Sequence, residues 1–238
     1  MESVPCVCGY NPYDKEVDKD QLHYCPSKEA LLNHVTFPCF RDVTDENDPS
    51  MVYYSGWDTG VIVTVQRHWC FIGQVVNVMP RLMRFRTYVK TRFGETTSIA
   101  FYLDNDQKLP CEIKPGFTLC ILYAERKTFL DQSTGIRQED PEVCWAFRAP
   151  FAEVQAEAQS LLKNVDNELS KLCFKCGQVT KTTCGRCKLA SYCSVECQRS
   201  CWNVHKHLCK DMKKLLGLAL LPRKKYEGPF TFQLFEEG

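Results

Sequence analysis

The middle of the chain alternates runs of β-branched and aromatic residues with clusters of turn formers, which is the pattern of short β-strands. The run Val61–Val65 is bounded by Gly60, and clear turn signals stand at Gly94-Glu95 and Asp104-Asn105-Asp106. The further runs are Gly73–Val78, Arg86–Phe93, Ser98–Leu103, Phe117–Ala124, Gly135–Arg137 and Val143–Phe147. Five or six strands within about 90 residues predict a mostly β domain over residues 51–149, folded as a small antiparallel barrel or sandwich.

The order of these strands resembles that of an oligonucleotide-binding (OB) fold. Two long strands and a hairpin are followed by a connection, a strand led by Lys114-Pro115-Gly116, and a final pair. Single-stranded nucleic acid is therefore an alternative partner, since basic and aromatic side chains interleave in this region and could contact phosphates and stack on bases. These residues are Arg81, Arg84, Phe85, Arg86, Tyr88, Lys90, Arg92 and Phe93. Any half-buried strand shows a similar alternation, which weighs against this hypothesis.

The segments on either side of the β domain have different patterns. Residues 1–50 predict an irregular segment with one short helix from Lys28 to His34, capped by Ser27. Residues 150–172 predict a helix, because Pro150 suits a first-turn position and apolar residues recur at helical spacing. That apolar stripe consists of Val154, Ala158, Leu161, Leu162, Val165 and Leu169. We interpret this helix as a linker to a small module at 173–209, which a tail at 210–238 follows.

Half of the sixteen cysteines lie between residues 173 and 209. Neither a signal peptide nor a membrane-spanning stretch is evident, so we expect an intracellular protein without a membrane partner. In a reducing compartment, clustered cysteines bind metal more often than they form disulfides. The pairs Cys6/Cys8 and His23/Cys25 could form another metal site, but their one-residue gaps suit a zinc knuckle poorly. The short basic cluster 223–225 could serve nuclear import, and nucleus and cytoplasm both stay open.

The cysteine-rich segment contains an ordered run of zinc ligands. The run is Cys173, Cys176, Cys184, Cys187, Cys193, Cys197, His205 and Cys209. Eight such residues suffice for two closed tetrahedral sites, one of four cysteines and one of three cysteines and a histidine. The pairs 173/176 and 184/187 form tight knuckles, whereas 193/197 and 205/209 lie one turn apart on a helix face. Each zinc ion needs one knuckle and one helical pair, but spacing alone leaves the pairing open.

Two further observations bear on these ligands. Cys201 shares the four-residue register of the helical pairs and could compete for a site, and His207 lies close to the second pair. Trp202, beside Cys201, could act as the hydrophobic plug of a module too small for a true core. Two filled tetrahedra leave no open coordination position, so we expect two structural Zn²⁺ ions and a binding protein, not an enzyme.

The element Cys193-Ser194-x-x-Cys197-Gln198, followed by Trp202-x-x-His205-Lys206-x-x-Cys209, resembles the MYND-type zinc finger over residues 173–209. The resemblance implies a cross-braced pairing, with ligands 173, 176, 193 and 197 on one ion and 184, 187, 205 and 209 on the other, and it leaves Cys201 outside both. MYND fingers chiefly bind partner proteins, several through short proline-rich segments that carry a Pro-x-Leu core. By position, Gln198 and Trp202 would contact such a peptide. Core packing for Trp202 and a solvated helix position for Gln198 are the alternatives.

Charge and motifs narrow the class of function. Residues 171–226 hold thirteen Lys and Arg residues against Glu196 and Asp211, although the whole chain has a formal net charge of only +1. A basic module can contact nucleic acid or an acidic partner, or its lysines can simply be solvated. A lysine methyltransferase is the enzymatic alternative, because some MYND fingers are inserted in SET-domain enzymes. No SET-type cofactor segment, nucleophile elbow, P-loop or HExxH motif is present in the sequence.

Overall fold

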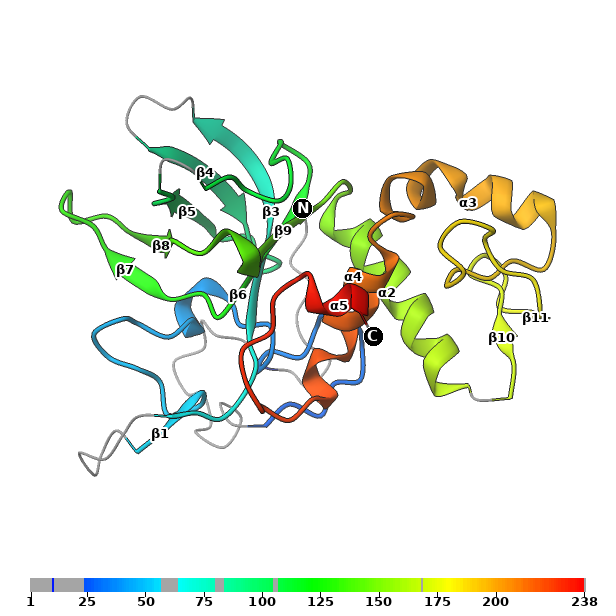
Figure 1. The fold of residues 1–238 in the computed structure, drawn as a ribbon, viewed down its shortest axis with the longest axis horizontal. Coiled ribbons are helices and arrows are strands. Elements are labelled where there is room, and N and C mark those ends of the chain that lie inside the picture. The colour runs from blue at the N-terminus through cyan, green and yellow to red at the C-terminus, as the bar shows by residue number, and fades with distance from the viewer. Residues whose placement is uncertain are drawn as a thin grey trace.

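The computed structural model describes residue 10 and residues 24–56, 64–79, 84–104, 107–167 and 169–237. A β-sheet lies at one end and the cysteine-rich segment at the other, where helix α3 (Val195–Leu208) is found (Figure 1). Helices α2 (Phe151–Asp166) and α4 (Met212–Leu220) lie between these two parts. None of the helices in the described ranges combines the length and the apolar character that a membrane span requires.

The described part of the main sheet contains seven strands in the order β7-β8-β5-β4-β3-β6-β9. They are β3 (Cys70–Met79), β4 (Phe85–Lys90), β5 (Thr96–Phe101), β6 (Thr118–Leu122), β7 (Arg126–Thr128), β8 (Thr134–Gln138) and β9 (Cys144–Phe147). Neighbouring strands are antiparallel except β5 and β8, which are parallel. Two smaller antiparallel pairs are β1 (Tyr54–Ser55) with β2 (Thr64–Val65) and β10 (Lys171–Leu172) with β11 (Val179–Thr180).

The predicted class, mostly β with a small zinc module, is confirmed. Five strands of the sheet have an OB-like connectivity, namely β3, β4, β5, β6 and β8. Strand β3 pairs with β4 and β6, β4 pairs with β5, and β5 pairs with β8. The parallel pairing of that last pair corrects the expected wholly antiparallel sheet. Strand β7 was not predicted, because its sequence, Arg-Lys-Thr, lacks apolar residues. Of the predicted strand 61–65, only Thr64 and Val65 lie among the described residues.

Apart from a small separate cluster of Tyr10, Cys25 and Val35, one continuous hydrophobic core extends from the sheet through the central helices into the cysteine-rich segment. In the sheet it includes Leu119 and Ile121, in α2 it includes Val154 and Leu161, and beyond these helices it continues into the cysteine-rich segment at Leu208. Strand β6 is buried along its full length, whereas β4 alternates buried and half-buried positions. The zinc-ligand segment therefore shares its core with the β domain and is not a separately packed appendage.

The predicted helix at 28–34 is wrong, because residues 29–37 form turns and bends instead. Leu31 adopts a left-handed backbone conformation (φ 62°), which an α-helix does not accommodate. The side chain of Asn33 accepts hydrogen bonds from the N–H groups of Val35 and Thr36, and this arrangement replaces helical bonding. The apolar patch at residues 30–32 is nevertheless buried in the core. A short 3-10 helix, η1 (Phe40–Asp42), follows.

Helix α2 is shorter and more central than the predicted linker over 150–172. It ends at Asp166, and Leu169 beyond it is 98% exposed. Near its end, the Asn164 side chain accepts a hydrogen bond from the N–H of Leu172 and donates to the hydroxyl of Ser191. These bonds, together with contacts to β10 and α3, attach the helix to the cysteine-rich segment, and α2 also packs against α4.

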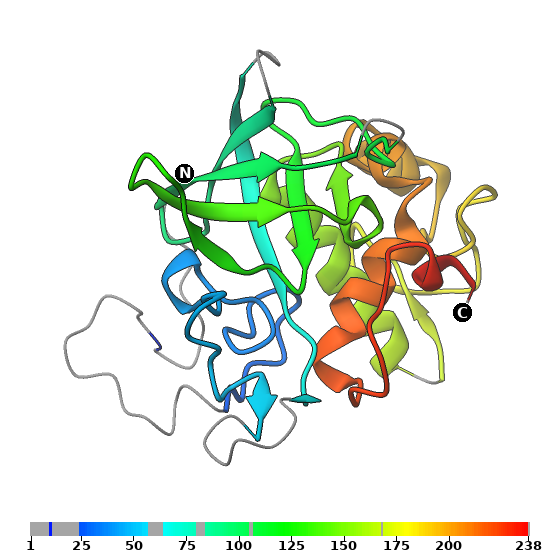
Figure 2. The same cartoon turned by 60° about the vertical axis from the view of Figure 1, so that its left-hand side comes forward.

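The segment after α4 returns to the sheet instead of extending away as a free tail (Figure 2, red). It contains η4 (Leu221–Arg223) and α5 (Leu234–Glu237). The remaining short helix, η3 (Pro141–Val143), lies elsewhere in the chain, directly before β9. Arg223 forms a two-point ion pair with Asp166 at the end of α2, with N–O distances of 2.5 and 3.0 Å. Further on, the N–H of Phe230 donates to the hydroxyl of Tyr123, which directly follows β6. These contacts fix the C-terminal segment against both α2 and the sheet.

Candidate metal centre

The two cysteine knuckles adopt the same type of backbone turn. In the first, the N–H of Gly177 donates to the carbonyl of Cys173, and Gly177 has a φ of 74°. In the second, the N–H of Lys188 donates to the carbonyl of Cys184, and Lys188 has a φ of 62°. Each knuckle thus closes on a residue in the left-handed region, four positions after its first cysteine. This turn places the two thiols of each knuckle on the same side of the loop.

Helix α3 presents the remaining ligands. Ser194 caps its N-terminus, accepting a hydrogen bond from the N–H of Cys197 at 3.2 Å. Cys193 precedes this cap, and His205 and Cys209 lie at the other end of the helix, with Cys209 as its C-cap residue. The predicted helical pair His205/Cys209 is therefore found at the end of α3, whereas the prediction is wrong for Cys193/Cys197, because Cys193 lies before the N-cap and only Cys197 is in the helix.

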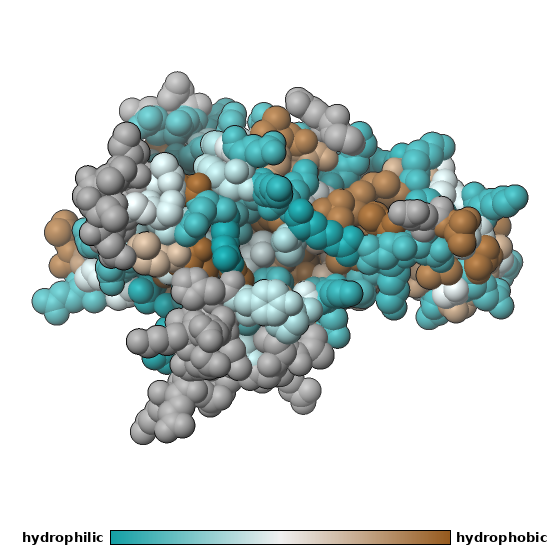
Figure 3. Space-filling view, turned by 90° about the horizontal axis from the view of Figure 1, so that it is seen from below, coloured by the Kyte–Doolittle hydropathy of each residue, from teal (hydrophilic) through white to brown (hydrophobic). Residues whose placement is uncertain are grey.

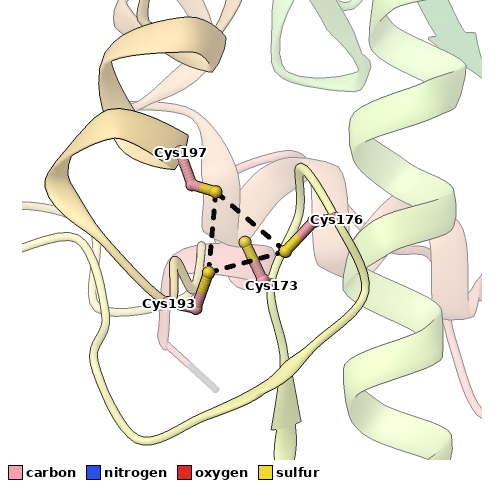
Figure 4. A group of neighbouring side chains, drawn as sticks. All are labelled: Cys173, Cys176, Cys193 and Cys197. Atoms are coloured by element: carbon pink, nitrogen blue, oxygen red, sulfur yellow. Dashed lines mark hydrogen bonds between the residues drawn. The ribbon is translucent and has the colours of Figure 1, made fainter.

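The first cluster consists of Cys173, Cys176, Cys193 and Cys197 (Figure 4). The Sγ of Cys176 lies 3.5 Å from that of Cys193 and 4.0 Å from that of Cys197, and the latter two are 3.5 Å apart. With zinc–sulfur bonds of about 2.3 Å, the corners of a tetrahedral site lie about 3.8 Å apart. The four thiols therefore fit one zinc ion.

The second cluster consists of Cys184, Cys187, His205 and Cys209. The Sγ atoms of Cys184 and Cys209 are 3.9 Å apart, and Nε2 of His205 lies 3.7 Å from the Sγ of Cys187. A tetrahedral site with one zinc–nitrogen bond of about 2.0–2.1 Å has a nitrogen–sulfur edge of about 3.6 Å. This donor set also fits one zinc ion, and it does so through Nε2 of the histidine.

The electrostatics of the thiols suit a divalent cation. Burial opposes ionisation of Cys173, but backbone N–H groups, that of Cys176 foremost, donate to its sulfur and hold its pKa at about 6. Cys184, opposed by burial in the same way, receives backbone N–H groups and also has a pKa of about 6. The neighbouring Cys176 thiol raises the pKa of Cys193 to about 12, and burial raises that of Cys209 to about 12. Ionisation of all the thiols in either cluster is thus favoured by a cation among them.

The structure brings together all eight predicted ligands, in the pairing that the family resemblance implied. Cys201, the competing candidate from the register on α3, belongs to neither cluster. It is half-buried, and burial raises the pKa of its thiol. Of the other metal candidates, Cys6, Cys8 and His23 lie outside the described residues, and Cys25 is buried without belonging to a metal cluster in the described ranges.

The two residues expected to contact a peptide lie on the surface of α3. Trp202 is 44% exposed, and its ring centroid lies 6.2 Å from that of His205, so it is not a buried plug. Gln198, one turn earlier, is half-buried. Val195, at the start of the same face, is 56% exposed. Figure 3, which is seen from the side away from α3, shows further hydrophobic surface at the same end of the molecule.

The basic and aromatic residues of the β domain have varied surroundings. Arg92 is buried and donates to the carbonyls of Leu31 and Phe37, so it anchors the N-terminal segment. Arg84 lies over the ring of Tyr102 at 3.7 Å. Phe85 packs against the core, and Arg81 lies outside the described residues.

Glu157 is a residue of this centre that the sequence prediction missed. It lies on the buried face of α2, and its Oε2 is 3.6 Å from Nδ1 of His205. The signal was present in the sequence, because Glu157 interrupts the apolar stripe between Val154 and Leu161 at a position that faces the core. Hydrophobic periodicity alone assigns such a carboxylate to the solvated face.

Fold and site together define a protein with a cross-braced, two-zinc finger joined to a β domain. The family model described as MYND finger matches residues 173–209, which comprise all eight ligand positions. Residues 173–209 are therefore a MYND finger, and its two clusters account for two structural zinc ions.

Curated relatives match this chain over short segments. Tudor domain-containing protein 1 of Oryzias latipes is 50% identical over 39 residues, which cover 16% of this chain and 3% of that protein. Protein CBFA2T2 of Xenopus laevis is 35% identical over 69 residues (29% and 12%). Histone-lysine N-methyltransferase Smyd1 of Mus musculus is 32% identical over 88 residues (37% and 18%). The chain thus spans less than a fifth of the length of each of these relatives.

Solved structures with a partial likeness include a replication protein A heterotrimer bound to single-stranded DNA, with a TM-score of 0.24 and 16% identity over 32% of this chain and 57% of that one. The Stn1–Ten1 complex of S. pombe has a TM-score of 0.28 and 13% identity, over 40% and 66% of the two chains. Likenesses of this size carry no argument about what the chain binds.

Proposed function

We propose that this protein is a non-catalytic adaptor whose MYND finger binds a short, proline-rich peptide of a partner protein. The observation that carries the proposal is the exposed side chain of Trp202 on α3, in line with Gln198 one turn earlier. Both residues are those that the family resemblance assigns to peptide contact. An exposed tryptophan beside a half-buried polar side chain suits a peptide that has an apolar residue and an accessible backbone.

The zinc clusters explain why this surface is suited to binding. Helix α3 supplies Cys197 to one cluster and His205 to the other, so zinc in both sites crosslinks each end of the helix to a different knuckle. The surface between the two ends is therefore preorganised, and little entropy is lost when a partner docks. An extended proline-rich peptide adds to this advantage, because it too is largely ordered before binding.

Fluorescence anisotropy of a labelled peptide with a Pro-x-Leu core, titrated with the zinc-loaded full chain, tests the proposal. Trp202→Ala should weaken binding at least about tenfold, as truncation of a central aromatic contact does. Val76→Ala is the matched control, because Val76 is 43% exposed but lies on β3 of the sheet. Equal affinities for wild type and Trp202→Ala would rule out this surface.

Single-stranded nucleic acid is a second candidate partner. In its favour, Arg84 and Arg137 both lie against the ring of Tyr102, at 3.7 and 4.4 Å from the centroid, beside strands β4 and β8. Guanidinium groups can stack on bases and pair with phosphates. Filter binding of single-stranded DNA and RNA at two salt concentrations is the test, and retention that does not fall with salt would remove this candidate.

A further inference from the structure

Helix α2 places one carboxylate against the zinc-binding histidine of the finger. Glu157 lies outside the finger, 16 residues before its first ligand, yet its Oε2 is 3.6 Å from Nδ1 of His205. Glu157 is 8% exposed and His205 is fully buried, so neither group can interact freely with bulk water. Burial of a carboxylate is costly unless it accepts hydrogen bonds, so its position opposite the histidine calls for a specific partner.

Three buried polar atoms in the neighbourhood of Glu157 lack a hydrogen bond within the described structure. Oε2 of Glu157, Nδ1 of His205 and the hydroxyl oxygen of Tyr192 are all buried and make none. The rings of Tyr192 and His205 meet edge to face, with centroids 5.9 Å apart. One acceptor and two potential donors thus share the same apolar surroundings, and an acceptor–donor pairing satisfies them at the lowest cost.

The orientation of His205 determines which nitrogen faces the carboxylate. Its Nε2 lies 3.7 Å from the Sγ of Cys187, inside the metal cluster, and this leaves Nδ1 on the opposite side of the ring. When a neutral imidazole binds a metal through one nitrogen, the other carries the proton and usually donates it to a carboxylate, a carbonyl or water. In the described surroundings of His205, Glu157 is the group in place to accept it.

We propose that Glu157 is a positioning residue for the Cys184/Cys187/His205/Cys209 zinc site, accepting the Nδ1–H hydrogen bond of His205. Glu157 thereby fixes the tautomer and the ring orientation of this ligand and strengthens zinc binding at this site alone. One consequence is that the full metal affinity of the finger depends on α2, a helix that lies outside the residues matched by the family model. The proposal concerns the metal site and is independent of which partner the finger binds.

The first test compares zinc release from the full-length, two-zinc protein to the chelator 4-(2-pyridylazo)resorcinol. Loss of such a supporting carboxylate typically costs about 10–100-fold in metal affinity. Glu157→Ala should therefore release one of its two ions about 10–100-fold more readily and the other unchanged, and Glu157→Gln, which keeps an acceptor oxygen, should be intermediate. Glu153→Gln, one turn earlier on α2 and less buried, is the matched control and should behave as wild type.

Substitution with Co²⁺ shows which site is affected, because the ligand-field bands of a four-thiolate site differ from those of a three-thiolate, one-imidazole site. The proposal predicts that Glu157→Ala loses the bands of the histidine-containing site first. Equal weakening of both sites would indicate a general packing defect and overturn the proposal, as would release kinetics identical to wild type.

A measurement on the wild-type protein keeps the proposal testable if Glu157→Ala does not fold. Imidazole ¹⁵N–¹H correlation spectra should show His205 bound through Nε2, with a downfield Nδ1–H proton that exchanges slowly with water. In Glu157→Gln this proton should move upfield and exchange faster. Rapid exchange of the Nδ1 proton in the wild-type protein would contradict the assigned hydrogen bond.

Discussion

Gly217 of α4 packs directly against the ring of Phe235, so closely that a Cβ added to Gly217 would lie 2.5 Å from Cγ of that ring. The ring of Phe235 in turn meets Phe232 edge to face, at a centroid distance of 5.6 Å, and Phe232 is 1% exposed. Because side chains do not approach this closely, glycine at this position allows the C-terminal segment to close over α4.

Gly217→Ala should destabilise the protein by about 1–3 kcal/mol, the usual cost of overpacking a core. Helix propensity alone predicts the opposite, because alanine is favoured over glycine in a helix by about 1 kcal/mol. Urea unfolding measures the free energy change, and limited proteolysis shows whether the segment after residue 221 is released. Gly185→Ala is the control, since no atom lies within 4 Å of its added Cβ. A Gly217→Ala protein as stable as wild type would contradict the close packing.

The exclusion of Cys201 from both clusters predicts a specific zinc count. Cys201→Ser should retain two zinc ions in native mass spectrometry, because its sulfur lies outside both ligand sets. Cys193→Ser should lose one ion, since a three-ligand site binds zinc far more weakly than a closed tetrahedron. If Cys201→Ser carried only one ion, the assignment of ligands would be wrong.

The shared core predicts that zinc removal affects more than the finger. Treatment with a chelator should abolish amide protection in 173–209, because the metal replaces a hydrophobic core there. We expect the loss to extend into α4 and the C-terminal segment, since Leu208, Met212 and Leu215 belong to the same buried cluster. Hydrogen exchange should show β3 and β6 retaining protection. Loss confined to 173–209 would mean that the finger folds as an independent module.

The hydrogen bonds of His68 make the stability of the C-terminal segment depend on pH. Its Nε2 lies 3.1 Å from the carbonyl oxygen of Lys225 and must donate to it, and its Nδ1 lies 2.7 Å from the hydroxyl of Tyr123. In the neutral ring Nδ1 accepts from that hydroxyl, and the Tyr123 oxygen remains free to accept from the N–H of Phe230. Burial lowers the pKa of His68 in the folded protein. A protonated ring would reverse the bond to Tyr123.

The unfolded chain therefore takes up a proton on His68 at a higher pH than the folded chain does. The stability that neutral His68 contributes is present above the unfolded pKa of about 6.5 and is lost as the pH falls through the lowered folded pKa. Amide protection factors of residues 224–232, which correct for the slower intrinsic exchange at low pH, should fall in wild type as the pH drops below about 6.5. In His68→Gln, these protection factors should be lower at neutral pH and should depend less on pH. An unchanged pH dependence in His68→Gln would refute this account.

The sequence predicted the zinc ligands well because metal geometry imposes spacing directly on the chain. A knuckle or a helical pair involves neighbouring residues, so the four pairs are visible without a structure. Most strands of the sheet were predictable for a similar reason, since runs of strand-forming residues between turn formers are local features of the sequence. Pairing of the clusters required more than spacing, and the family pattern supplied it.

What could not be predicted depends on contacts between distant residues. The N–H of Ala30 donates to Oε1 of Gln159 on α2, and this contact joins positions 129 residues apart in a region where local pattern favoured a helix. Glu157 illustrates the same limit, because the role of a carboxylate in an apolar stripe cannot be predicted until the fold shows that it lies opposite His205. Neither relationship leaves a periodic signal in the sequence.

The most direct test of the proposed adaptor function is a chemical-shift map of the ¹⁵N-labelled, zinc-loaded full chain titrated with a Pro-x-Leu peptide. The account predicts that the largest changes fall on residues 195–202 of α3, including the indole N–H of Trp202, while resonances of β4 and β5 stay in place. Saturable changes centred on the sheet, or none at peptide concentrations up to about 1 mM, which corresponds to a binding free energy of roughly −4 kcal/mol, would contradict it.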